Sequence, residues 1–216
     1  MVKTSEIGSN VIISFQTKYP TFSYADWDKV MTELGFQRVT NTTTPKGGQP
    51  QQIVFTKENI SVDVDWQNSI LNFRFFNRIN VMKVHDTIQK ILLSLKIDPS
   101  SINVMGLTCT TMAHDVGIPT DNLTSLISNE AKSRIAKILL SEPTVNSIVF
   151  MNKSAEEEDL QIRIEPLFSN PQESFYININ YRTKVHEKFD NFIGTFGEDT
   201  IKEIALSICD KNAKNN

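Results

Sequence analysis

The chain has 216 residues, of which 39% are hydrophobic and 22% charged, as in an ordinary globular protein that can bury a core. A formal net charge of −3 argues against a general electrostatic attraction to nucleic acid or anionic lipid, while leaving room for a local basic patch. The sequence contains neither the apolar stretch of a signal peptide nor an apolar run approaching the roughly 20 residues that span a membrane. We therefore expect a soluble, cytoplasmic protein.

The first half of the chain predicts the order strand, helix, four strands, helix. Ser23 is a candidate N-cap for the first helix and Gly35 ends it, while Asp98-Pro99 stops the second helix. Two runs of strict apolar–polar alternation predict strands with one buried face and one face turned to water or a partner. The predicted strands are 11–15, 37–43, 53–55, 60–66 and 71–76, and the predicted helices are 24–34 and 81–96.

The second half follows the same order with diverged residues. The last helix is predicted to be continuous from near Thr183 to about Asp210, because apolar residues keep helical phase across Gly194 and Gly197, where it is expected to kink. The predicted strands are 104–111, 145–151, 160–165 and 175–182, and a helix is predicted over 120–139.

A repeated motif indicates that the two halves are copies of one unit. Lys83-Val84-His85-Asp86 opens the last helix of the first half and recurs as Lys184-Val185-His186-Glu187 at the same place in the second. We predict an α+β fold of two β-α-β(3–4)-α repeats related by a pseudo-two-fold axis. Each repeat is a curved antiparallel sheet with two helices on one face, and the sheets join edge to edge. The predicted divisions are a flexible N-terminus at 1–10, the first repeat at 11–100, the second repeat at 101–210 and a disordered tail at 211–216.

The polar side of the alternating strands is the candidate functional surface. Arginine is enriched at interface centres, and its planar guanidinium makes several contacts at once, so a mixed-charge face containing arginines favours a protein partner. The candidate partner-binding residues are Asp63, Asp65, Arg74, Arg163, Glu165, Asn178, Asn180 and Arg182.

The order of elements resembles the fold of the TATA-box-binding proteins, which is also a duplicated strand-helix-sheet-helix unit. In that family the concave sheet face binds the minor groove of DNA through phenylalanine wedges surrounded by basic and asparagine side chains. The resemblance implies nucleic-acid binding as the alternative function. The acidic side chains Asp63, Asp65 and Glu165 disfavour it, because they would face phosphates.

A second resemblance covers about Val11 to Ile208. The pattern is similar to a sporadically distributed family of uncharacterised prokaryotic proteins, with a strand hairpin before a long C-terminal helix and a Gly-Leu strand near the middle. That family implies no activity for this chain. The matching segments are Ile53–Glu58, Ser61–Asn77, Val81–Lys96, Met105-Gly106-Leu107-Thr108 and Leu160–Arg182.

Other reactive residues are better explained by packing. Cys109 and Cys209 have no metal-ligand spacing and are read as reduced thiols. His85 and His186, at equivalent helix starts, could bind a ligand symmetrically, but neither has a second ligand four residues on. Asp63, Asp65 and Glu165 could hold a cation, but cross-strand pairing with the arginines is simpler. We expect no cofactor, no metal and no catalysis.

The function that the sequence favours is therefore a non-catalytic interaction module. It would bind a protein partner or a second copy of itself, through the polar sheet face or an edge strand. Nucleic-acid binding is the alternative, and a membrane partner is not expected.

Overall fold

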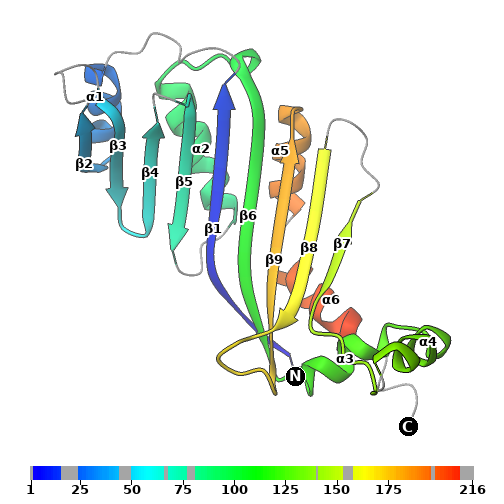
Figure 1. Ribbon diagram of the computed structural model, residues 1–216. Coiled ribbons are helices and arrows are strands. Elements are labelled where there is room, and N and C mark those ends of the chain that lie inside the picture. The colour runs from blue at the N-terminus through cyan, green and yellow to red at the C-terminus, as the bar shows by residue number, and fades with distance from the viewer. Residues whose placement is uncertain are drawn as a thin grey trace.

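The structure is a computed structural model that describes residues 2–15, 24–43, 50–65, 68–76, 81–139, 141–152, 158–195 and 198–209. It is α+β, as predicted, with one nine-stranded sheet in the order β2-β3-β4-β5-β1-β6-β9-β8-β7 (Figure 1). All neighbouring strands pair antiparallel. In chain order the elements are β1 (Lys3–Phe15), α1 (Tyr24–Glu33), β2 (Gln37–Thr43), β3 (Pro50–Lys57), β4 (Ile60–Asp65), β5 (Ile70–Phe76), α2 (Val81–Ser94), the 3-10 turn η1 (Pro99–Ser101), β6 (Ile102–His114), α3 (Pro119–Ser125), α4 (Asn129–Leu139), β7 (Ile148–Met151), β8 (Glu158–Pro166), β9 (Ser174–Thr183), α5 (His186–Thr195) and α6 (Glu198–Cys209).

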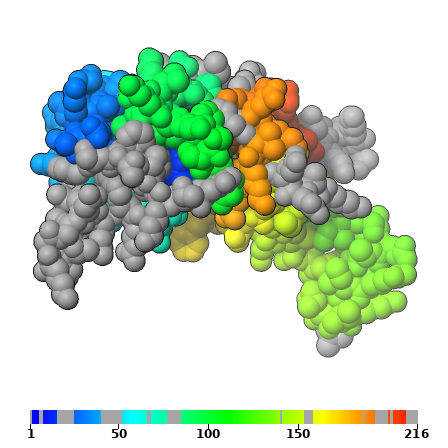
Figure 2. Space-filling model, turned by 90° about the horizontal axis from the view of Figure 1, so that it is seen from above, coloured from blue at the N-terminus to red at the C-terminus, as the bar shows by residue number. Residues whose placement is uncertain are grey.

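The helices α1, α2, α5 and α6 lie on one face of the sheet (Figure 1). Seen from above, α1 (blue) and α5 (orange) belong to one layer along the sheet, and the segment with α4 projects away from that layer (Figure 2). The side chains beneath the helices form the core, because apolar residues alternate along each strand and the helices exclude water from that side. Fully buried examples are Val11, Ile13, Leu71, Phe73, Ile177 and Phe175.

The strands before and after residue 100 form a single sheet, as the edge-to-edge prediction requires. The joint is the pair β1–β6, whose register runs from Lys3 opposite His114 to Phe15 opposite Ile102. Two long strands paired side by side leave neither half with an open edge at the centre, where it would be prone to aggregation.

The predicted flexible terminus at 1–10 is wrong for most of its length. β1 begins at Lys3, so Lys3–Asn10 are part of the sheet, with a register shift between Glu6 and Gly8. This stretch has little apolar alternation of its own. It forms a strand because β6 offers it a continuous row of backbone partners.

The helix predicted over 120–139 is two helices. α3 ends at Ser125, where the backbone N–H of Leu126 bonds to the carbonyls of Leu123 and Thr124. Ser128 then opens α4 by accepting a hydrogen bond at its hydroxyl from the N–H of Ala131 at 3.2 Å. The apolar period continues through the break, which is why the sequence pattern did not reveal it.

The predicted C-terminal helix corresponds to α5, which ends at Thr195, and α6, which begins at Glu198; the two residues between them lie outside the described residues. The predicted N-cap Ser23 and the predicted tail at 211–216 lie outside the described residues. Gly35 ends the first helix as predicted, with a positive φ of 82° that favours glycine. Within the described part of the chain, no helix has both the length and the apolar character to cross a membrane.

Candidate interaction surface on the open sheet face

The face of the sheet opposite the helices, here called the open face, carries all eight predicted site residues. Because side chains alternate along a strand and residues in register point the same way, the face of each residue follows from its neighbours. Asp63 is flanked by buried Val62 and Val64, and Asn178 by buried Ile177 and Ile179. The sequence pattern therefore placed these side chains on the correct face.

At the β4–β5 end of the open face, Asp63 is the central group. It is only 6% exposed, although it lies on the face without helices. Its Oδ2 accepts a hydrogen bond from Nε2 of Gln52 at 2.6 Å and lies 3.5 Å from Nη2 of Arg74. A buried carboxylate is stable only when paired and hydrogen-bonded, so Gln52 and Arg74 are the groups that keep it in place.

Three side-chain oxygens on β4, β5 and β1 are buried without a hydrogen-bond partner among the described residues. They are Oδ1 of Asp63, Oδ1 of Asn72 and Oδ1 of Asn10. The residues lie on adjacent strands: Asp63 is opposite Asn72, and Asn10 is opposite Arg74, two residues further along β5. A buried acceptor without a donor costs about 1–3 kcal/mol, so these oxygens lower the stability of this part of the sheet.

Asp65 makes local hydrogen bonds at the end of β4. Its Oδ1 accepts a hydrogen bond from the N–H of Asn68 at 3.0 Å, and its Oδ2 accepts one from Nδ2 of Asn68 at 2.7 Å. These bonds join the end of β4 to the residue two positions before β5, so they stabilise the connection between the two strands.

On the other side of the centre, a chain of hydrogen bonds joins β6 to β9. Thr108 donates from Oγ1 to Oδ1 of Asn180 at 2.8 Å, and Asn180 donates from Nδ2 to Oδ1 of Asn178 at 2.6 Å. Asn178 in turn donates from Nδ2 to Oγ1 of Thr110 at 3.1 Å. Linked polar groups of this kind hold each other's rotamers, so the two asparagine side chains keep a fixed orientation on the open face.

The arginines of the open face differ in their pairing. Arg163 bonds to Glu165 on the same strand, with 2.7 Å between Nη2 and Oε2, and both ends are accessible. Arg182 is exposed and, within the described residues, makes no ion pair. The exposed guanidinium of Arg182 can therefore bind acidic or carbonyl groups without first breaking an ion pair.

The predicted acidic groups are not close together. Five strand spacings separate β4 from β8, which places Asp63 and Glu165 about 24 Å apart. Among the described residues no three His, Cys, Asp or Glu side chains are placed to hold a metal ion. The acids and arginines instead form two separate pairs, Asp63 with Arg74 and Arg163 with Glu165.

The histidines lie away from the arginines of this surface. Nε2 of His85 on α2 lies 3.0 Å from Oδ1 of Asp190 on α5, where the two helices pack together. His186 begins α5, but its side chain lies outside the description. The two ring nitrogens of His114 contact the hydroxyls of Ser5 and Ser174 at 3.1 and 2.9 Å.

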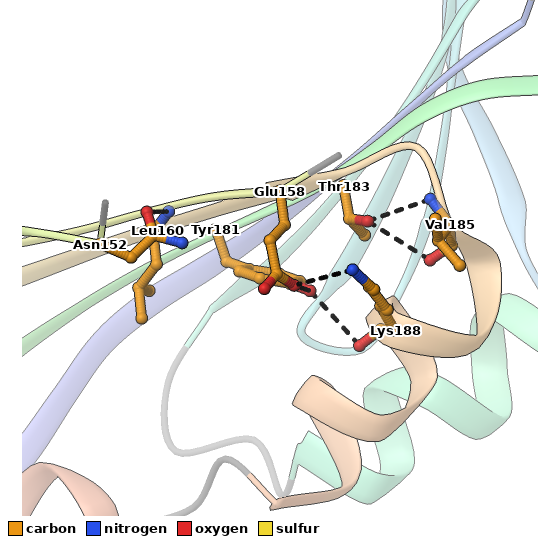
Figure 3. Close-up of polar contacts among 7 residues, drawn as sticks. All are labelled: Asn152, Glu158, Leu160, Tyr181, Thr183, Val185 and Lys188. Carbon is orange, nitrogen blue, oxygen red and sulfur yellow. Dashed lines mark hydrogen bonds and ion pairs between the residues drawn. The ribbon is translucent and has the colours of Figure 1, made fainter. Parts of the chain in front are cut away.

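A second polar cluster joins β9 to α5 on the helix side of the sheet (Figure 3). Tyr181 donates from its hydroxyl to Oε2 of Glu158 at 3.2 Å, and its ring stacks on Phe192 with 3.9 Å between centroids. Burial, and then the neighbouring Glu158 carboxylate, raise the pKa of Tyr181 to about 12. The hydroxyl therefore stays protonated at neutral pH and acts as a structural donor.

Several residues of the open face escaped the sequence analysis. Asn10 was assigned to the terminus because its strand lacks apolar alternation. Thr108 and Thr110 alternate with buried Leu107 and Cys109, so the sequence pattern already indicated that they lie on the open face.

In comparisons with known proteins, neither a protein-family model nor a curated protein matches this sequence.

Proposed function

We propose that the chain is a non-catalytic interaction module whose open face binds a protein partner. The observation that supports this is the mixture of charged and polar side chains on that face. It carries the exposed guanidinium groups of Arg163 and Arg182, the partly exposed carboxylate of Glu165 and the hydrogen-bonded amides of Asn178 and Asn180. A protein surface supplies N–H donors together with carbonyl and carboxylate acceptors, so it complements such a face.

The acidic side chains of the same face argue against nucleic acid, the alternative function. The carboxylates of Asp65 and Glu165 would face phosphates, which carry the same sign of charge. We expect duplex DNA to bind no tighter than about 10 μM at physiological salt, near ordinary non-specific affinity. Fluorescence anisotropy that gave nanomolar, salt-sensitive binding would favour the nucleic-acid function instead.

The structure-guided test changes Arg163 and Arg182 together. Replacing both with Glu should leave folding nearly intact, because exposed charges contribute about 0–1 kcal/mol each. Arg74 is left unchanged, since a glutamate there would face the buried Asp63 carboxylate. Wild-type protein and variant are used as baits in the organism's own cell extract, with captured proteins quantified by mass spectrometry.

The control for this test is Lys90→Glu/Lys137→Glu. It makes the same change of charge at exposed positions of α2 and α4. The proposal expects the control to capture the wild-type partner and the arginine variant to lose it. If a correctly folded arginine variant captures the same partner as strongly as the control, the open face is not the binding surface.

We also propose that the fold is a duplication with a pseudo-two-fold axis between Asn10 and Thr108, which lie opposite each other on β1 and β6. Outward from this pair the strands follow as β5, β4, β3 on one side and β9, β8, β7 on the other. The row through the pair continues to Arg74 and Ser61 on one side, and to Asn180 and Gln161 on the other.

The helix pair α2–α5 agrees with this axis. Gln89 lies four residues after His85, as Asp190 lies four residues after His186. Across the α2–α5 contact, both His85 and Gln89 reach Oδ1 of Asp190, at 3.0 and 3.4 Å. Gln89 and Asp190, which occupy equivalent positions four residues after the repeated histidines, therefore meet between the two helices, as a two-fold relation between the helices predicts.

A further inference from the structure

The edge strand β7 is apolar and exposed. It ends the nine-stranded sheet, and its residues Val149, Phe150 and Met151 are 45, 47 and 64% exposed. An edge strand presents unpaired backbone N–H and C=O groups, and natural proteins usually protect such edges by keeping the strand very short or with charges, prolines or bulges. β7 is short, with the sequence IVFM, but it contains no charge, proline or bulge.

The opposite edge shows the protection that β7 lacks. β2 pairs with β3 through two register shifts, one between Arg38 and Thr40 and one between Thr42 and Thr43. Arg38 also forms an ion pair with Asp28. β7 instead follows β8 in continuous register from Ile148 to Met151, so its outer edge is regular enough to accept another strand.

The hydrogen bonds next to β7 show which of its backbone groups face outward. The N–H of Asn152 bonds to the carbonyl of Leu160 at 3.1 Å, so this pair is a hydrogen-bonded one. In antiparallel pairing, hydrogen-bonded residues alternate with residues that point away from the partner strand. Ile148 and Phe150 therefore bond to β8, while the N–H and C=O of Val149 and Met151 point outward.

We propose that β7 pairs antiparallel with β7 of a second copy of this chain, with Phe150 opposite its own counterpart on the two-fold axis. In this register Val149 bonds to Met151 of the partner subunit, and Met151 bonds to the partner subunit's Val149. All four outward backbone groups of each β7 are then satisfied. The two Phe150 side chains form a non-hydrogen-bonded pair, with Cα atoms about 4.5 Å apart, where cross-strand aromatic contacts are favourable.

The strand itself argues for a second copy as its occupant. Its outward groups sit at two positions symmetric about Phe150, so the edge is complementary to itself under a two-fold rotation. Neither β7 nor the adjoining Ser147 and Asn152 carries a charge, so two copies meet without like-charge repulsion. The pairing would also join the two open faces, because Val149 lies opposite Arg163 and Met151 opposite Gln161.

The contact is small, which sets the expected strength. Stable interfaces bury about 1,200–2,000 Å² in total, more than one four-residue strand pair covers. The dimer should therefore form only at micromolar or higher concentration. It is independent of the open-face proposal, since it uses backbone groups and apolar side chains at the sheet edge.

Sedimentation velocity between about 1 and 500 μM tests the dimer. The wild type should shift from monomer to dimer over this range. Met151→Lys should raise the dissociation constant at least tenfold, because each lysine is placed at the shared edge. Val39→Lys is the matched control, since Val39 is 63% exposed on the other edge strand, and it should dimerise like the wild type. A wild type that stays monomeric throughout, or an unchanged Met151→Lys variant, would overturn the proposal.

Disulfide trapping tests the register and does not depend on how Met151→Lys folds. Phe150→Cys should cross-link on mild oxidation, because its Cα atoms are about 4.5 Å apart in the dimer. Val149→Cys faces Met151 of the partner subunit and lies two residues from its own counterpart, beyond the roughly 7 Å reach of a disulfide. Wild-type protein controls for the native cysteines. Equal cross-linking of the two cysteine variants would contradict the proposed register.

Discussion

Asp63 and Arg74 are joined across β4 and β5 at 3.5 Å, although their side chains differ greatly in exposure, at 8% for Asp63 and 51% for Arg74. The carboxylate has lost most of its hydration and the guanidinium has not. The pair is therefore asymmetric. Removing Arg74 would leave a buried carboxylate without a counter-charge, whereas removing Asp63 would leave a guanidinium that water still solvates.

Arg74→Gln should lower the free energy of unfolding by about 1–3 kcal/mol, because it leaves the buried carboxylate of Asp63 with Gln52 as its one polar partner. Urea unfolding followed by circular dichroism measures this. Asp63→Asn/Arg74→Gln should lose less than the sum of its single substitutions, since the charge that needed a partner is gone.

Arg163→Gln is the control for that experiment. It removes an arginine of the same face from a pair whose ends are 53 and 29% exposed, so a loss of at most about 1 kcal/mol is expected. Equal losses for Arg74→Gln and Arg163→Gln would show that the burial of Asp63 does not govern the stability of its pair.

The sequence predicted the open face well where alternation was strong. In β4 and β5 the buried residues Val62, Val64, Leu71 and Phe73 alternate with polar ones, so the face of Asp63 and Arg74 followed directly. Asn10 could not be found in this way, because its part of β1 has little apolar alternation. Its strand depends on pairing with β6, which is a contact about 100 residues away in the chain.

The break between α3 and α4 was not visible in the sequence for a related reason. Leu123, Leu126 and Ile127 keep the helical period through the end of α3, so apolar periodicity alone reads as one helix. The break is made by local hydrogen bonds at Leu126 and Ile127, which turn the chain without a proline or glycine. Pairings such as Asp65 with Asn68 were equally hidden, because the pattern fixes the face of a side chain and leaves its contacts open.

Tyr181 predicts how stability changes at alkaline pH. Its pKa is about 12 in the folded protein and near 10 when unfolded, so folding favours the protonated phenol. The contribution is complete below pH 10 and is lost as the pH rises from about 10 to 12, with a total of roughly 2–3 kcal/mol. Between pH 9 and pH 11, urea unfolding should show a larger loss for the wild type than for Tyr181→Phe. A parallel decline of the two proteins would contradict this role, because all other groups titrate in both.

The proposed duplication predicts that the chain can be divided between residues 100 and 101. This point lies in η1, whose residues Pro99 and Ser100 are exposed, and it separates β1 from β6. Co-expressed fragments 1–100 and 101–216 should assemble one to one through the β1–β6 pair. Fragment 1–100 alone should form a homodimer in which β1 of a second copy takes the place of β6, as measured by light scattering.

The control for the divided chain is a cut between Glu58 and Asn59, in the turn that joins β3 to β4. This cut falls inside one repeat and separates strands of the same hairpin, so reassembly should be poorer. If the chain cut at 58–59 reassembles better than the chain cut at 100–101, the two repeats are not the natural units of the fold.

Gly8 and Gly106 give the last prediction, because they test how tightly the central strands are packed. A Cβ at Gly8 would lie 3.0 Å from the carbonyl oxygen of Phe75, whereas one at Gly106 would lie 3.4 Å from that of Tyr181. Gly8→Ala must displace the backbone of β5 next to the register shift in β1. It should therefore cost about 1–2 kcal/mol of unfolding free energy in a urea titration. Gly106→Ala makes nearly ordinary contacts and restricts the unfolded chain, so it should be close to neutral or slightly stabilising. Equal effects would mean that β1 and β5 can separate at Gly8 without strain.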